Sequence, residues 1–542
     1  MKTVALIDAD LEKTPLGTRS RLADPLEGVP VLRRTVRQLA QVSRLSGITV
    51  VGPPDQVDSI AALLAQTPAR VRPRNIAEPG FRKLVRTARK WSLDGWRGGL
   101  GGSTALDEYI DPELCRQVGQ AESADAVAVA PPGAALLDPH LTDALLTHAE
   151  QHEAESKLTF AQAPPGILPT VLRQELSAQL ADHRVPPGWA LAYKPDDPSI
   201  DLVFRTCNFP IGAAVRYAAG RLTADTARSF RDMELMLAHG TAHDADDMGR
   251  WLQEARANDC GDLPREVEIE LTTADPLPET RLRPRGARVP QRGPIGVDVV
   301  ARLAATLAER DDDALVVLGG FGDPLLHPEF EAVLAALRSG GVYGISVTTT
   351  GQRLDDKALA ALIRHRVDVV VFQLDAHSPD CYRAVNGGAL EVATDALARL
   401  PQARADAQQA EPIIVPQMTK STRNVEEMDV FFDTWMRAQG WATIAGFSHF
   451  GGRLDDLTVV GMAPPRRRPC RRIMHRCVVL TDGTVTACDQ DYAGDLPLGK
   501  LTEQSLGEIW TGSAARLLRK RHFDDQPQLA GLCGACEEWH RP

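Results

Sequence analysis

Short apolar runs alternate with amphipathic stretches along the first half of the chain, and this pattern predicts strands that alternate with helices. The run at 126–130 is apolar throughout, which is typical of a strand buried in a parallel sheet. The predicted strands are 4–7, 48–52 and 126–130, and the predicted helices are 31–42, 57–64 and 141–148. The β-α-β-α order predicts a parallel sheet with helices on its faces.

The second half repeats strand and helix in the same way. Its first strand, 267–273, alternates apolar and polar residues. The other predicted strands are 314–318, 344–351, 367–374 and 412–418, with helices at 297–307, 330–337 and 357–363. Such repeats build a barrel or partial barrel whose functional loops lie at the C-terminal ends of the strands. Residues 228–258, with methionines and tryptophans at helical spacing, are predicted as one helix that connects the two halves.

Length and composition bound the possible classes of protein. A chain of 542 residues is too long for one core, so several domains are expected. The predicted parts are an α/β domain at 1–245, a helical linker at 246–265, a partial (β/α) barrel at 266–455 and a small cysteine-rich α+β module at 456–542. The net charge of −11 argues against nucleic-acid binding. No apolar run is long enough for a membrane span, and the remaining cysteines are scattered singly, so a cytoplasmic location is expected.

Five of the nine cysteines lie in about the last seventy residues, at 470, 477, 488, 533 and 536. Residues 478–480 and 485–488 flank an Asp482-Gly483 turn and predict a hairpin, and helices are predicted at 506–510 and 514–521. Four thiolates that bind one iron–sulfur cluster or one zinc ion commonly come from a C-x-x-C pair together with cysteines on a hairpin. The end of the chain is therefore the first candidate for a metal site.

Three predicted strands of the second half end in distinctive loops: Gly320-Phe321-Gly322-Asp323-Pro324, Thr349-Thr350-Gly351 and Gln373-Leu374-Asp375. In this order they resemble the radical S-adenosylmethionine (SAM) superfamily, over residues 265–455. The first resembles the family's loop for the amino group of SAM. The resemblance implies a partial TIM barrel, and it implies these cofactor-binding residues: Gly320, Gly322, Asp323, Thr350 and Asp375.

The family's three-cysteine C-x-x-x-C-x-x-C motif, which should follow the first barrel strand, is missing. Its places fall at Asp275, Glu279 and Leu282, which cannot hold a cluster that needs soft thiolates. We therefore expect the ordinary radical reaction to be absent, while the sequence leaves open whether SAM still binds. Asp275, Glu279 and Asp323 could instead hold a hard cation, but solvated acids in a proline-rich loop are the plainer interpretation. Single histidines at 327 and 449 are expected to have packing roles.

The cysteine-rich end resembles the SPASM or twitch extension of radical SAM peptide-modifying enzymes. The spacing from Cys470 through Gly483 to Cys488 fits that pattern, as does the helix Leu506-Gly507-Glu508-Ile509-Trp510. The resemblance implies that four residues bind one [4Fe–4S] cluster: Cys470, Cys488, Cys533 and Cys536. Four thiolates suit zinc as well, which stays the alternative. Cys477 is left out. Arginines between 466 and 476 either offset the cluster's charge or form a solvated basic face that docks a partner.

The start of the chain resembles nucleotidyltransferases with a glycosyltransferase-A-like fold, through residues 18–22 and 25–32. The loop 8–12 is acidic where the family has glycines that bind triphosphate, and no Asp follows the strand 126–130 to hold a metal. A glycine-dense segment, 96–104, either cradles an anion or is a surface loop.

Three hypotheses follow. The first is an iron–sulfur protein of radical SAM/SPASM descent that cannot cleave SAM by the usual route and has a binding or electron-transfer role. Its partner would be a peptide, protein or small molecule. The second is an active nucleotidyl- or sugar-transferase that depends on Arg19 and Arg21. The third is a zinc-stapled scaffold.

Overall fold

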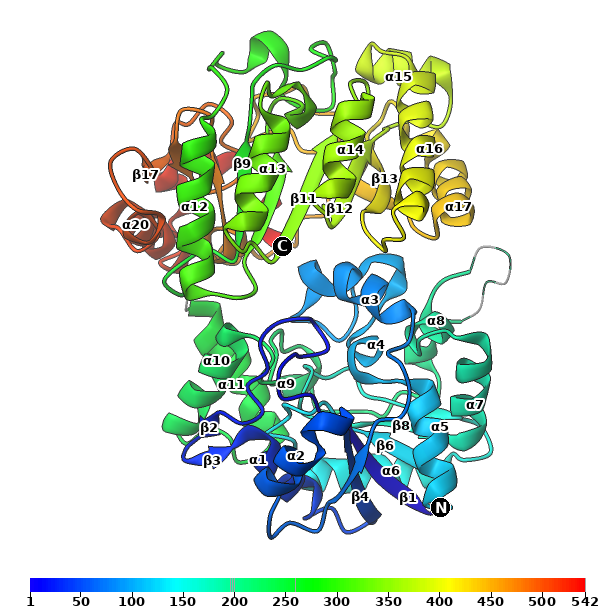
Figure 1. The fold of residues 1–542 in the computed structure, drawn as a ribbon. Coiled ribbons are helices and arrows are strands. Elements are labelled where there is room, and N and C mark those ends of the chain that lie inside the picture. Colours follow the sequence, from blue (N-terminus) through cyan, green and yellow to red (C-terminus); the bar gives the residue numbers. More distant parts are fainter. Residues whose placement is uncertain (195, 197, 199, 259, 542) are drawn as a thin grey trace. The chain divides into compact units, whose positions relative to one another are not determined.

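The computed structural model describes residues 1–541 except 195, 197, 199 and 259. The chain divides into two compact units, Met1–Ala257 and Asn258–Pro542, and each is described by itself (Figure 1). The division falls within the stretch predicted as a linker. No helix in the described part of the chain is both long and apolar enough to cross a membrane.

The first unit is built on a six-stranded sheet. Its strands are β1 (Thr3–Asp8), β4 (Leu45–Gly52), β5 (Arg70–Pro73), β6 (Ala126–Val129), β7 (Leu158–Thr159) and β8 (Thr170–Arg173). They lie in the order β5-β4-β1-β6-β8-β7. Strands β5, β4, β1 and β6 run parallel, and β8 runs antiparallel to both of its neighbours. The parallel-dominated α/β class is as the sequence predicted.

Helices cover both faces of this sheet because alternate residues of its strands point to opposite sides. In β1, Ala5 and Ile7 belong to one apolar core, and Val4 and Leu6 belong to the other. The helices of the first core are α1 (Val31–Leu39), α2 (Val57–Leu63), α6 (Pro139–Gln151), α10 (Ala227–Ala238) and α11 (Ala245–Asn258). Those of the second are α4 (Ala105–Tyr109), α5 (Pro112–Ala121) and α7 (Gln174–His183).

The single helix predicted over 228–258 is wrong, since α10 and α11 are separate. Gly240 has a φ of +64°, a left-handed conformation that ends α10. The side chain of Asp244 then accepts a hydrogen bond from the backbone N–H of Asp247, at 2.8 Å, in the first turn of α11. The apolar residues keep their helical spacing across this break, because each of the two helices packs an apolar face toward the sheet.

The second unit is built on a nine-stranded sheet. Its strands are β9 (Glu266–Glu270), β10 (Leu315–Gly319), β11 (Gly344–Thr349), β12 (Val369–Gln373), β13 (Ile413–Lys420), β14 (Thr443–Gly446), β15 (Arg476–Val479), β16 (Thr484–Thr486) and β17 (Pro497–Lys500). Strands β9 to β14 are parallel neighbours in chain order, as a partial barrel requires.

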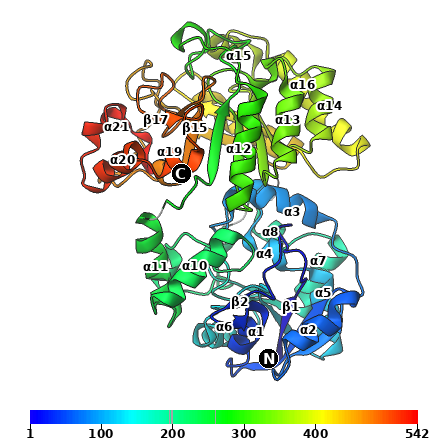
Figure 2. The same cartoon turned by 60° about the vertical axis from the view of Figure 1, so that its left-hand side comes forward.

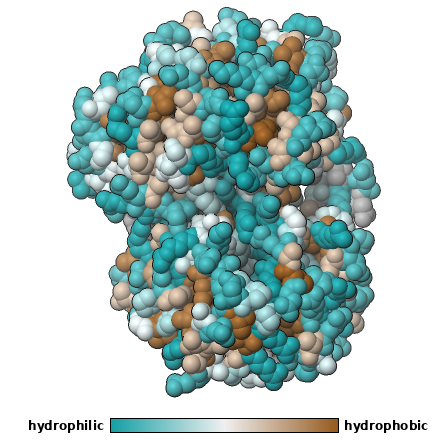
Figure 3. All heavy atoms as spheres, viewed as in Figure 1, coloured by the Kyte–Doolittle hydropathy of each residue, from teal (hydrophilic) through white to brown (hydrophobic). Residues whose placement is uncertain are grey.

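Helices connect the parallel strands and cover one side of them, as Figure 1 shows for the first three. They are α12 (Val297–Arg310), α13 (Phe330–Ser339), α14 (Asp356–Arg364), α15 (Pro379–Asn386), α16 (Leu390–Asp406) and α17 (Met428–Gln439). The predicted elements of this unit agree with the observed ones to within a few residues. On the molecular face of Figure 3, hydrophobic side chains form small patches among hydrophilic ones, as folded proteins usually show.

The cysteine-rich module continues the barrel sheet. Strand β15 lies parallel to β9, with Cys477 opposite Val267, and β16 and β17 follow as antiparallel neighbours. The module's helices are α18 (Arg472–His475), α19 (Leu506–Trp510), α20 (Ser513–Phe523) and α21 (Leu532–Ala535). The last three lie close together in Figure 2. The segments predicted as two domains, 266–455 and 456–542, thus share one sheet.

Candidate functional site

The C-terminal ends of the barrel strands carry buried carboxylates, and arginines from the segment after β9 pair with them. Arg283 donates to Asp375 Oδ2 at 2.7 Å, and the two side chains are at most 9% exposed. Arg292 lies 3.2 Å from Glu270 at the end of β9. The mouth of the barrel is therefore held by internal ion pairs, which supply the partners that buried charges need.

Asp323 stands at the end of β10, in the loop that resembles the SAM-binding one, and is fully engaged by its neighbours. Its carboxylate accepts hydrogen bonds from the hydroxyls of Thr349 and Thr350 and from the backbone N–H of Thr350, at 2.8–3.0 Å. Burial raises the pKa of Asp323, the charge of Asp275 adds to this, and the hydrogen bonds act against it. The structure thus brings Asp323 and Thr350 together at one site.

The glycines of that loop are required by close approach of the backbone. A Cβ on Gly322 would lie 2.1 Å from the carbonyl oxygen of Thr272, and Gly320 has a φ of +81°. The backbone N–H of Gly320 donates to Glu268 Oε1 at 2.9 Å. Asp375 lies two strands away, with a φ of +61°, and accepts a hydrogen bond from the backbone N–H of Thr419 at 2.8 Å.

The three places of the missing motif do not form one group. The side chain of Asp275 is 1% exposed, and its Oδ2 lies 2.8 Å from the Nε of Arg285, whose side chain is 5% exposed. Glu279 is exposed, and Leu282 packs in a small apolar cluster. The expectation of solvated acids is thus wrong for Asp275, because a guanidinium provides its counter-charge inside the protein. It is also wrong for Asp323, which is 2% exposed.

The two singled-out histidines have structural partners. His327 pairs through Nε2 with the carbonyl of Ile295 at 2.9 Å, and its Nδ1 accepts from the backbone N–H of Glu329. His449 Nδ1 accepts from the backbone N–H of Gly452 at 2.7 Å.

The four predicted cluster ligands lie in the cysteine-rich module. Cys470 precedes α18, Cys488 follows β16, and Cys533 and Cys536 are at α21. Cys470 is buried in an apolar cluster against which Cys533 packs. Burial raises the pKa of Cys533 to about 12, with the charge of Cys470 and then that of Cys536 as further causes. The thiols are therefore near enough to influence one another.

This donor set fits a soft metal centre by its chemistry. Among the described residues, no three His, Cys, Asp or Glu side chains are placed so that they could hold an ion as they stand. Burial raises the pKa of Cys488 well above its ordinary value, with the charges of Asp489 and then Cys470 adding to this. A bound cation opposes such a shift, because metal binding requires and stabilises the thiolate form.

Two further cysteines are near the four predicted ligands, Cys477 within the module and Cys260 before the barrel. Cys477 faces the main core of the unit, where burial raises its pKa to about 12, so it acts as an apolar residue. Cys260 packs against the cluster that contains Cys470, and its carbonyl accepts from the Nε1 of Trp510 at 2.9 Å. The sequence pattern held no signal for Cys260, since 210 residues separate it from Cys470.

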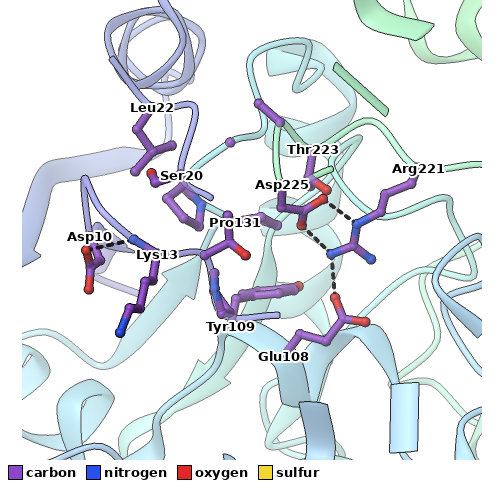
Figure 4. A pocket seen from close by; sticks show the side chains of 15 residues that line it. Asp10, Lys13, Ser20, Leu22, Glu108, Tyr109, Pro131, Arg221, Thr223 and Asp225 are labelled. Atoms are coloured by element: carbon purple, nitrogen blue, oxygen red, sulfur yellow. Dashed lines mark hydrogen bonds and ion pairs between the residues drawn. The ribbon is translucent and has the colours of Figure 1, made fainter. Parts of the chain in front are cut away.

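In the first unit, a small pocket lies where the loops after β1 and β6 meet (Figure 4). These strands are neighbours at the point where the order of the sheet reverses, the usual ligand position in such sheets. Its volume is about 20 Å³, room for about one water molecule. The hydroxyls of Ser20 and Thr223 line it, and both are buried without a hydrogen-bond partner among the described residues.

The residues predicted for a transferase have other partners. Arg19 is 65% exposed and pairs with Asp24 at 3.0 Å, and Arg21 donates to the carbonyl of Arg19. Three charged residues that line the pocket, Glu108, Arg221 and Asp225, belong to a buried network that sequence reasoning missed. In it, Glu108 pairs with Arg89 at 2.7 Å and with Arg221 at 2.6 Å.

The glycine-dense segment 96–104 leads into α4 through a buried capping box. Asp107 accepts from the backbone N–H of Thr104 at 2.7 Å and from the backbone N–H of Gly188. Burial raises the pKa of Asp107 to about 6 from its ordinary 3.8, and these hydrogen bonds reduce the shift. In this structure the segment's polar contacts are therefore internal, which favours its interpretation as a structural loop.

The raised pKa of Asp107 predicts a pH dependence of stability. The contribution of a carboxyl with a raised folded-state pKa is complete below the unfolded value of 3.8 and is lost as the pH rises through 6. The first unit should therefore gain about 1.3 kcal/mol from this group between pH 7 and pH 5. Urea unfolding at both pH values, for wild type and Asp107→Asn, measures it. An equal pH effect in both proteins would contradict the assignment.

Comparisons with known proteins agree with the architecture of the second unit. Residues 284–422 match the model of the radical SAM superfamily, and residues 470–537 match SPASM, an iron–sulfur cluster-binding domain. The second unit therefore contains a radical SAM domain followed by a SPASM domain. The radical SAM match begins after the three places of the missing cysteine motif.

Individual relatives are distant. A protein of Treponema pallidum (strain Nichols), described as uncharacterized, is 26% identical over 302 residues, which is 53% of this chain and 82% of that protein. The structure of BtrN in complex with AdoMet and 2-DOIA has a TM-score of 0.36 and 17% identity, and covers 51% of this chain and 93% of its own. A cytidylyltransferase from Leptospira borgpetersenii serovar Hardjo-bovis has a TM-score of 0.32 and 12% identity, covering 47% of this chain and 95% of its own.

Proposed function

We propose that this protein binds one iron–sulfur cluster through Cys470, Cys488, Cys533 and Cys536 and does not cleave SAM by the radical route. The observation that carries the proposal is the contrast between two sites in one unit. The SPASM match contains all four cysteines, whereas the motif that would hold a SAM-cleaving cluster is absent from the sequence. When bound, the cluster supplies one-electron chemistry.

The surroundings of Asp275 support the second half of the proposal. Arg285 pairs with this carboxylate inside the barrel, where a cluster would need thiolates. Asp323 accepts from four donors, the hydroxyls of Thr349 and Thr350 and the backbone N–H groups of Thr350 and Leu325, which leaves it little capacity for the amino group of SAM. The retained role is binding of a peptide, protein or small-molecule partner, or electron transfer.

The surroundings of the cysteines support the first half. Arg467 donates to the carbonyl oxygen of Cys533 at 2.6 Å, and Arg472 pairs with Asp489 at 2.6 Å. These arginines anchor the chain around the thiols and place positive charge beside an anionic cluster. None of the cysteines in the described part of the chain forms a disulfide, which favours a reducing compartment such as the cytoplasm.

The proposal predicts a definite metal content. Protein purified and reconstituted without oxygen should contain about four irons per chain and show the broad visible absorption of thiolate-bound iron. Incubation with SAM and dithionite should give no 5′-deoxyadenosine. About eight irons per chain, or 5′-deoxyadenosine above the level of a protein-free control, would contradict it. Zinc without visible absorption would instead support a zinc-stapled scaffold.

No transferase reaction is proposed for the first unit. Its pocket has room for about one water molecule, and of the two cations among the described residues that line it, Arg221 is already paired with Glu108 and Asp225, which leaves only Lys13. A triphosphate needs cations or backbone N–H groups that are available to it.

A further inference from the structure

Helix α20, in the cysteine-rich module, has an outer face that is both basic and apolar. Its buried side holds Ala515 and Leu518. On the exposed side, Leu517 is 50% and Phe523 is 41% exposed. Two exposed cations flank Leu517 along the helix, Arg516 just before it and Lys520 between it and Phe523, and the helix contains no acidic residue. Large apolar side chains in such a setting are typical of an interaction surface.

A second basic segment, residues 466–472, packs against the same helix. The backbone N–H of Cys470 faces His522 Nδ1 at 3.5 Å, and Arg519 of α20 donates to the carbonyl of Ile473 at 3.0 Å. The helix and the segment therefore form one continuous region of the module.

The arginines of this segment divide into two sets. Arg467 and Arg472 are turned toward the module, where they bond to the Cys533 carbonyl and to Asp489. The others are exposed and have no ion pair or side-chain hydrogen bond within the described part of the chain: Arg466, Arg468 and Arg471. The structure thus separates arginines that hold the fold from arginines that face outward.

We propose that a basic rim docks an acidic segment of a partner protein, with Leu517 and Phe523 as its apolar anchors. The basic rim comprises the outward-facing cations Arg466, Arg468, Arg471, Arg516 and Lys520. Lys520 also pairs with Asp524, so the unpaired arginines carry most of the available charge. An apolar centre with a charged border is the usual composition of a protein–protein contact.

The charge of the whole chain favours a protein over a nucleic acid or a membrane. With a net charge of −11, the protein repels extended polyanions and anionic bilayers beyond the small area of the rim. A short acidic segment meets only the rim. The inference deepens the proposed binding role and rests on it, because a partner docked here would lie beside the cysteines.

The test uses the full-length reconstituted protein and a fluorescein-labelled peptide of fourteen residues, acidic except for two leucines and one phenylalanine. Titration by fluorescence anisotropy should show binding that weakens with salt. The double variant Arg466→Glu/Arg516→Glu should weaken it about tenfold, because each reversed charge turns an attraction into a repulsion. Leu517→Ser/Phe523→Ser should weaken it by a similar factor without changing the salt dependence.

The matched control is Arg302→Glu/Arg383→Glu, which reverses two exposed arginines elsewhere on the unit, 61% and 68% exposed. It should leave peptide binding unchanged. Equal weakening in control and rim variants would overturn the proposal. So would tighter binding of a single-stranded oligonucleotide of equal charge, or of phosphatidylserine vesicles. Iron content is measured on the same samples. If the peptide binds through the basic rim but the protein contains no iron, the proposed cluster is contradicted and the docking surface is not. If the protein contains iron but the rim variants bind the peptide as the wild type does, the docking surface is contradicted and the cluster is not.

Discussion

Cys533→Ser is expected to lose nearly all of the roughly four irons per chain that the reconstituted wild type should bind. A serine hydroxyl is a harder and far less acidic ligand than a thiol, so a four-thiolate site loses one of its bonds to iron. Cys533 is one of the two cysteines of the C-x-x-C pair at α21, and the three other candidate ligands come from the same module. Iron and acid-labile sulfide per chain, together with visible absorption, measure the effect.

Cys477→Ala is the matched control, because Cys477 belongs to the same module but packs in the apolar core. It should keep its iron and lose about 1 kcal/mol of stability through a small cavity. Loss of iron in Cys477→Ala, or full iron in Cys533→Ser, would mean that the ligand set is misassigned.

Glu108→Gln is expected to destabilise the first unit by about 3–5 kcal/mol. The side chains of Glu108 and its two guanidinium partners, Arg89 and Arg221, are at most 4% exposed. Burial alone would raise the pKa of Glu108, but the charges of Arg221 and Arg89 hold it below its ordinary value. The variant leaves two buried cations without their shared counter-charge. Urea unfolding at pH 7, with hydrogen exchange in α4 and α5 to localise the change, measures it.

Glu113→Gln provides the comparison, because Glu113 pairs with Arg116 on the surface of α5, where both side chains are about one-third exposed. It should change the free energy of unfolding by less than about 1 kcal/mol. If the two variants were equally stable, the buried network would not hold this unit together.

Local patterns predicted the order of the strands well. The apolar residues of 314–318 and 344–351, with the turn signals beside them, were enough to predict two strands, and the structure has β10 and β11 there. The same signals failed at 228–258, where two helices share one periodicity. They also gave no sign that the hairpin beginning at Arg476 would pair with β9, since strand pairing depends on contacts far apart in the chain.

In the candidate sites, too, some features follow from local sequence and others depend on residues far apart in the chain. Cysteine spacing and the loop after β10 are local, so the sequence by itself predicted a thiolate site and determined that no C-x-x-x-C-x-x-C motif is present. Only the tertiary structure decided what surrounds those residues. Arg283 meets Asp375 across 92 positions, and Arg221 meets Glu108 across 113. Such pairs form because the sheets bring strand ends together and burial requires each charge to have a partner. A pattern read along the chain carries no information about which distant residue will be that partner.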